Sequence, residues 1–180
     1  LWQERGAAFQ VFRGPEADEA SVREAAAAAD CLHFACHGVG VSLGSLGLSM
    51  LVLAPPRDPL ADDDGLLRAT EILQDGRWRV GRWQLVILSA CSTNVGAAGR
   101  DDAPQALPIG FLLAGARSVV GTLWPVDDAA TRELMVDFHR SLLENGGDRL
   151  QALVESKRAL RKKHPSPRAW APFVWHGLPN

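Results

Sequence analysis

Two unbroken apolar runs constrain the fold of this chain more than any other feature. They are LVILSAC (85–91) and SVVGTLW (118–124), and neither alternates polar with apolar residues as a half-exposed strand does. Strands of this kind have both faces covered, which is typical of a parallel sheet between layers of helices. Between them, PQALPIGFLLAGA (104–116) predicts a helix entered after Pro108 and closed near Gly115.

The rest of the chain continues this alternation of strands and helices. Further strands are predicted at 7–12, 31–36, 48–54 and 170–177, and further helices at 17–29, 128–145 and 149–164. The expected fold class is therefore α/β with a mainly parallel sheet. Sheets of this type place their ligand sites beyond the carboxyl ends of the strands.

Composition indicates one globular domain. The 180 residues are 47% hydrophobic and 22% charged, as in a soluble folded protein, and no linker or repeat divides residues 1–180. A net charge of −2 gives no reason to expect nucleic acid or an anionic membrane as a partner. The longest apolar run is interrupted by Arg117 and is too short to span a bilayer. Because the chain starts at Leu1 within what reads as folded sequence, we expect it to be the C-terminal part of a longer polypeptide.

The cysteines point to a reducing compartment. Cys31, Cys36 and Cys91 are an odd, sparse set without the spacing of a disulfide framework. The expected location is therefore the cytoplasm.

A histidine and a cysteine carry the strongest chemical signal. His37 follows the run CLHFAC (31–36), and Cys91 closes LVILSAC, so both are expected at the same edge of the sheet. A thiol is mostly protonated at neutral pH, and a nucleophilic cysteine therefore needs a nearby base. Either residue alone would more often be structural, but together they favour a Cys–His dyad. The backbone N–H groups of Gly38 and Cys91 are then candidates to stabilise an oxyanion.

Two metal sites compete with the dyad and are less favoured. His33 and His37 would be about 13 Å apart along a continuous strand, too far to share one zinc ion unless the strand breaks. His33 is expected to be a core residue instead. Asp62, Asp64 and Glu71 match part of a calcium-binding loop. The alternative is a polar turn leading into a helix that begins near Thr70. No metal or cofactor is predicted.

Four segments resemble the CHAT domain, a caspase-like cysteine peptidase family often fused to TPR repeats. They are LHFACHG, LVILSACSTNVG, AGARSVVGTLWPVDDAAT and WAPFVWHG, and the resemblance extends from about Phe9 to Gly177. It implies a caspase–haemoglobinase-like three-layer sandwich with His37 and Cys91 as the catalytic pair. Caspase-like sheets also place a central first strand between the predicted strands 7–12 and 31–36. This chain begins too late to supply it, so we expect that strand to come from sequence before Leu1.

The same resemblance suggests substrate contacts. LWPVDDAAT is similar to a segment of separase, a eukaryotic relative in which acidic residues help to recognise a basic side chain. Asp127 and Asp128 are therefore candidates for substrate binding, and a helix N-cap is the alternative for both. The Gly-rich loop 92–105 resembles regions that gate caspase-like sites or are cut during activation, although a solvated connection is the plainer interpretation.

The resulting hypothesis is a cysteine endopeptidase that cleaves a protein substrate. The resemblance implies regulation by a TPR-like or sensor region, in the same chain or another, within a bacterial signalling or defence pathway. The alternative is a non-catalytic caspase-like module retained for assembly or scaffolding.

Overall fold

A computed structural model describes most of the chain. It covers residues 8–43, 46–58, 62–74, 78, 83–90, 106–144 and 148–179, with only the backbone of 40–43 and 46–48. The helical elements are η2 (Gly14–Glu16), α1 (Glu19–Ala26), α2 (Ala69–Gln74), α3 (Ala106–Leu113), α4 (Asp128–Glu144), α5 (Arg149–Lys163) and α6 (Pro167–Trp170). The strands are β1 (Cys31–Phe34), β2 (His37–Leu43), β3 (Leu46–Val52), β4 (Leu66–Arg68), β5 (Leu85–Leu88), β6 (Ser118–Thr122) and β7 (Phe173–Gly177).

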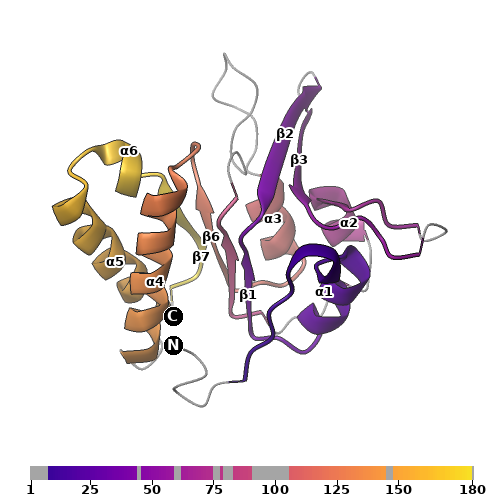
Figure 1. Ribbon diagram of the computed structural model, residues 1–180, viewed down its shortest axis with the longest axis horizontal. Coiled ribbons are helices and arrows are strands. Elements are labelled where there is room, and N and C mark those ends of the chain that lie inside the picture. Colours follow the sequence, from indigo (N-terminus) through magenta and orange to yellow (C-terminus); the bar gives the residue numbers. More distant parts are fainter. Residues whose placement is uncertain are drawn as a thin grey trace.

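The main sheet is mostly parallel. Its strand order is β1-β5-β6-β7, with β1, β5 and β6 parallel and β7 antiparallel to β6. Helices α1, α2 and α3 lie on one side of it and α4, α5 and α6 on the other (Figure 1). The expected α/β fold class and three-layer arrangement are confirmed.

Strand β5 is apolar throughout because both of its faces are covered by protein. All four of its residues are buried, and successive side chains of a strand point to opposite faces. Val86 and Leu88 belong to the core beneath α1 and α3, whereas Leu85 and Ile87 belong to the core beneath α4 and α5. A polar residue at any of these positions would be buried without a partner, so the alternation of an amphipathic strand is absent.

A smaller antiparallel sheet begins at the end of β1. Its strand order is β2-β3-β4, and the β2–β3 hairpin rises beyond the main sheet (Figure 1). The apolar run that was expected to form one strand over 31–36 therefore ends at Phe34. His37 starts β2, opposite Val52 of β3.

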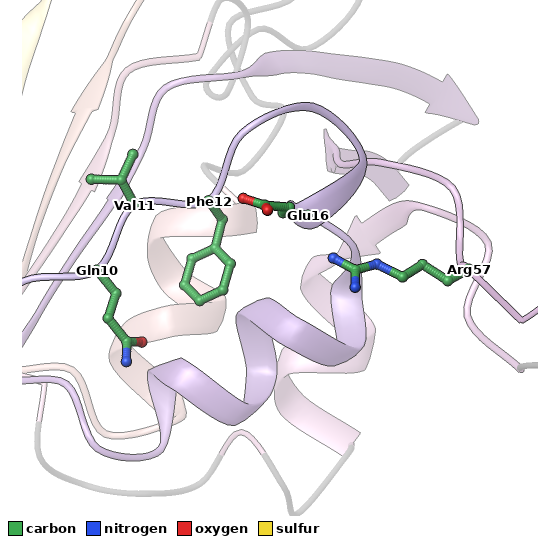
Figure 2. A pocket seen from close by; sticks show the side chains of 5 residues that line it. All are labelled: Gln10, Val11, Phe12, Glu16 and Arg57. Atoms are coloured by element: carbon green, nitrogen blue, oxygen red, sulfur yellow. The ribbon is translucent and has the colours of Figure 1, made fainter.

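The strand predicted at 7–12 is wrong for the described residues 8–12, which belong to no strand. The segment has an extended shape, since Gln10 and Phe12 point to one side and Val11 to the other (Figure 2). These side chains, with Glu16 and Arg57, line a surface hollow of about 400 Å³. Phe9 and Val11 are about half exposed, because no described strand pairs with the segment. β-propensity alone does not make a strand without a neighbour to complete the hydrogen-bond ladder.

Strand β1 lies at the edge of the main sheet, since β5 is its one neighbour among the described strands. The further strand expected from sequence before Leu1 stays a prediction.

Candidate active site

A cleft of about 860 Å³ opens where β1 and β5 end. Its lining comes from the ends of β1 and β5, the start of β2, the end of β3 and one side of α4. The residues are His33, Ala35, Cys36, His37, Val52, Ser89, Asp128, Thr131, Arg132, Met135, Val136 and His139. This is the position that a parallel α/β sheet favours for a ligand site, and the volume suits a ligand or a peptide side chain.

One stripe of α4 forms a wall of the cleft. The residues that line it recur at intervals of three or four, from Asp128 through Arg132 to His139, and so share one face of the helix. A neighbouring stripe, with Ala130, Leu134 and Phe138, packs into the core against the sheet. The helix therefore presents one face to the core and another to the cleft.

His37 projects into this cleft from the first position of β2. Its side chain is exposed and lines the cleft. The turn at Ala35 and Cys36 separates it from the main sheet, so the histidine stands at the junction of the two sheets. An exposed imidazole at this junction can accept and return a proton.

Cys91 lies outside the described residues, and so does the loop 92–105. The described chain approaches Cys91 along β5 and ends with Ser89 and Ala90. Ser89 lines the cleft, and the Ala90 carbonyl accepts a hydrogen bond from Thr122 Oγ1 at 3.2 Å. Ser89, two residues before Cys91, therefore lines the same cleft as His37.

His33 is not the enclosed core residue that was expected, because it lines the cleft. Its Nε2 lies 2.9 Å from Ser89 Oγ, and its Nδ1 lies 3.0 Å from His139 Nε2. Solvent reaches the ring from the cleft, but the surrounding protein displaces most of the water that would stabilise an imidazolium. This burial, together with the charge of His139, lowers the pKa of His33 to about 3.

The break after Phe34 also removes the spacing argument against a metal shared by His33 and His37, because that argument assumed a continuous strand. Both ring nitrogens of His33 instead have protein partners.

Cys36 is a second thiol in the cleft but a poor nucleophile. Burial raises its pKa to about 11, although the Val52 N–H opposes this effect. The thiol is therefore protonated at neutral pH, and thiolate is the reactive form. This leaves Cys91 as the stronger candidate.

The two candidate substrate carboxylates differ in position. Asp127 caps α4, because its Oδ1 accepts hydrogen bonds from the N–H groups of Ala129 at 3.0 Å and Ala130 at 3.1 Å. Asp128 is the first residue of α4 and lines the cleft. The geometry therefore supports the cap for Asp127 and leaves Asp128 as the substrate candidate.

Gly38 lies in β2 opposite Leu51, next to His37. Its role as an oxyanion donor stays a prediction, as does that of the Cys91 N–H.

The calcium-like segment is organised by an arginine. Arg68 lies 2.7 Å from Asp64 Oδ2 and 3.1 Å from Glu71 Oε1. A guanidinium between two of the expected ligands opposes the binding of a cation there. Helix α2 begins at Ala69, as the polar-turn alternative predicted.

Sequence analysis missed Ser89 and His139 as members of the site. Two signals point to them. Ser89 is two residues from Cys91 on the same strand run, and His139 is eleven residues from Asp128, which is close to three helical turns.

Comparison with known proteins gives a family match. Residues 2–177 match the family model described as the CHAT domain. The chain is also similar to tetratricopeptide repeat protein 28 of Mus musculus, with 30% identity over 204 aligned residues. That alignment covers 93% of this chain and 8% of the relative, so the chain spans less than a tenth of that protein's length.

None of the helices in the described ranges is both long and apolar enough to cross a membrane.

Proposed function

Because the chain belongs to the CHAT-domain family, which is related to caspase-like peptidases, we propose that it is a cysteine endopeptidase with Cys91 as nucleophile. His37 is the general base and acid, and a protein is the substrate. The observation that carries the proposal is the cleft that is lined by both His37 and Ser89, the residue two positions before Cys91.

The reaction needs no cofactor. His37 takes the proton of the Cys91 thiol, and the sulfur attacks the scissile carbonyl to form a C–S bond. The N–H groups of Gly38 and Cys91 stabilise the oxyanion. As the C–N bond breaks, His37 gives its proton to the leaving amine. Water, deprotonated by His37, then attacks the acyl-enzyme; the C–S bond breaks, the carboxylic acid product leaves, and His37 returns the proton to the Cys91 sulfur.

Asp128 gives the cleft a preference for a basic substrate side chain. Among the described residues of the lining it is the acidic one, and the Met135 and Val136 side chains provide apolar contact for the aliphatic stem of a lysine or arginine. Arg132 lines the same wall. Its positive charge repels a basic substrate side chain and so weakens this preference.

The regulatory partner is proposed to be a TPR-like or sensor region in the same or another polypeptide. The similarity to a tetratricopeptide repeat protein supports this. The cytoplasmic location rests on cysteine usage alone. Because the relative is from a mouse, the bacterial setting stays a prediction that the comparison does not support.

The first test is cleavage of a mixed peptide library by the full chain, with and without a TPR-containing partner. We expect His37→Ala to lower the rate by about 10²- to 10⁴-fold, the usual contribution of general acid–base catalysis. Cys91→Ala is expected to abolish the cuts. Cys36→Ala is the matched control, since it removes the other thiol of the cleft and leaves cleavage unchanged.

A labelling experiment tests the nucleophile without an activator. Peptidyl electrophiles should modify Cys91 faster than Cys31 and Cys36, and His37→Ala should remove the difference. If all three cysteines react at the rate of ordinary thiols and no cuts appear with the partner, the non-catalytic scaffold is the better description.

A further inference from the structure

Three polar side chains on the cleft lining form a continuous hydrogen-bonded array. Ser89 directly follows β5, His33 lies in β1 and His139 in α4, and the two links measure 2.9 and 3.0 Å. We propose that this Ser–His–His array is a positioning device that fixes the strand ends carrying Cys91 and His37 against α4. The inference rests on the proposed function, because it concerns the alignment of that catalytic pair.

The array acts close to both catalytic residues along the chain. Ser89 precedes Cys91 by two residues, and His33 precedes His37 by four. The Ser89 N–H also donates to the Phe34 carbonyl at 2.9 Å, so backbone and side chain both tie the end of β5 to β1. A shift of about 1 Å between reacting groups can cost about a hundredfold in rate, which makes such fixation valuable.

The protonation of the array suits positioning and not catalysis. A neutral imidazole has one donor and one acceptor nitrogen, which matches the two partners of His33 in either tautomer. Burial lowers the pKa of His139 as well as that of His33, so both rings are uncharged near neutral pH. A ring that resists protonation is a weak base there, and the base assignment therefore remains with His37.

Helix α4 does not need the array in order to stay docked. Ala130, Leu134 and Phe138 hold it in the core, whereas His139 meets His33 on the cleft side. The His33 and His139 rings are tilted by 37° with centroids 5.2 Å apart, so the link is the hydrogen bond and not a stacked pair. Removing this link is expected to misalign the site while the fold persists.

The test measures alkylation of Cys91 by iodoacetamide between pH 5 and 9, resolved by mass spectrometry. His139→Phe keeps an aromatic ring and removes both nitrogens. We expect it to slow alkylation near neutral pH by about tenfold and to shift the midpoint of the pH profile upward, because a displaced imidazole no longer favours the thiolate. The urea midpoint of unfolding should stay near that of the wild type.

Two further variants separate positioning from general damage. His139→Gln places an amide near the position of Nε2 and should restore both rate and midpoint. Ser89→Ala cuts the other link and should reproduce the effect of His139→Phe. His176→Phe is the matched control, since His176 lies on β7, outside the cleft lining, and the change should leave the profile unchanged.

The outcomes distinguish this inference from the proposed function. A wild-type Cys91 that reacts as an ordinary thiol, when no cuts appear with the partner either, would overturn the function, and the inference with it. A reactive Cys91 with the same profile in wild type, His139→Phe and Ser89→Ala would overturn the array alone. If Cys91 is alkylated slowly in His139→Phe and equally slowly in His139→Gln, this would also count against a positioning role.

Discussion

At the scale of single residues, neighbours in the sequence have different roles. Asp127 and Asp128 are adjacent and carry the same charge, and the sequence alone left cap and substrate contact open for both. In the structure Asp127 caps the N-terminus of α4 by accepting two backbone hydrogen bonds, whereas Asp128 lines the cleft. A single step along the backbone therefore separates a stabilising residue from a candidate specificity residue.

The first prediction concerns Asp127. Asp127→Ala should lower the free energy of unfolding by about 1 kcal/mol, because the first turn of α4 loses its cap. Urea titration measures this loss. Peptide preference should be unchanged, and a change in preference would show that the carboxylate also reaches the substrate.

The second prediction concerns Asp128. Asp128→Asn should reduce kcat/KM for a substrate with a basic side chain, relative to an apolar one, by about fivefold, since an exposed ion pair contributes up to about 1 kcal/mol. Arg132→Gln should change the ratio in the opposite direction. Kinetics on paired peptides measure both effects, and equal ratios in all three proteins would exclude a role for this wall in charge selection.

At the scale of elements, single strands and helices direct their side chains to different faces, and this forms both the cores and the cleft. Strand β5 divides its side chains between two cores, and α4 divides its faces between one core and the cleft. The strand lengths were less predictable. The run 31–36 contains no residue that stops a strand, yet β1 ends at Phe34 and His37 joins another sheet. His37 pairs with Val52 in the β2–β3 hairpin, and the residues of the run 31–36 themselves carry no signal for the break.

The third prediction compares two apolar residues of α4. Leu134 is fully buried, whereas Val136 is 43% exposed in the cleft. Leu134→Ala should cost about 2–5 kcal/mol of unfolding free energy, whereas Val136→Ala should cost about 0.5 kcal/mol. Urea titrations provide the comparison. Similar losses would mean that the two faces of α4 are not distinct.

At the scale of the whole molecule, one central sheet connects two cores and several buried ionisable groups. Burial lowers the pKa values of His33, His139 and His176. The unfolded chain therefore binds protons at these histidines at a higher pH than the folded protein. Burial raises the pKa of Glu19, which acts in the opposite direction.

The fourth prediction follows from the sign of these shifts. As the pH falls from about 6.5, the ordinary pKa of histidine, toward 3, protons bind preferentially to the unfolded state, and the free energy of unfolding decreases. Urea titrations at pH 7.5, 6 and 5 should show this decrease. His176→Gln should make the dependence shallower, and Glu19→Gln should make it steeper. A free energy of unfolding that rises on acidification would contradict the lowered pKa values of the three histidines.

The sequence by itself determined the fold class, the helices and the strands with two buried faces, because apolar periodicity and helix breakers act locally. It placed His37 after a strand over 31–36, whereas in the structure His37 is the first residue of β2. Tertiary structure decided the features that depend on a pairing strand or a hydrogen-bond partner from elsewhere in the chain. Residues 8–12 form no strand because no described neighbour pairs with them, and β1 breaks because β3 pairs with the residues beyond it. His33 enters the cleft because Ser89 and His139 come from two distant elements to complete its hydrogen bonds. Hydrogen-bond partners far apart in sequence are set by packing, and this is why the Ser–His–His array could not be read from the residues alone.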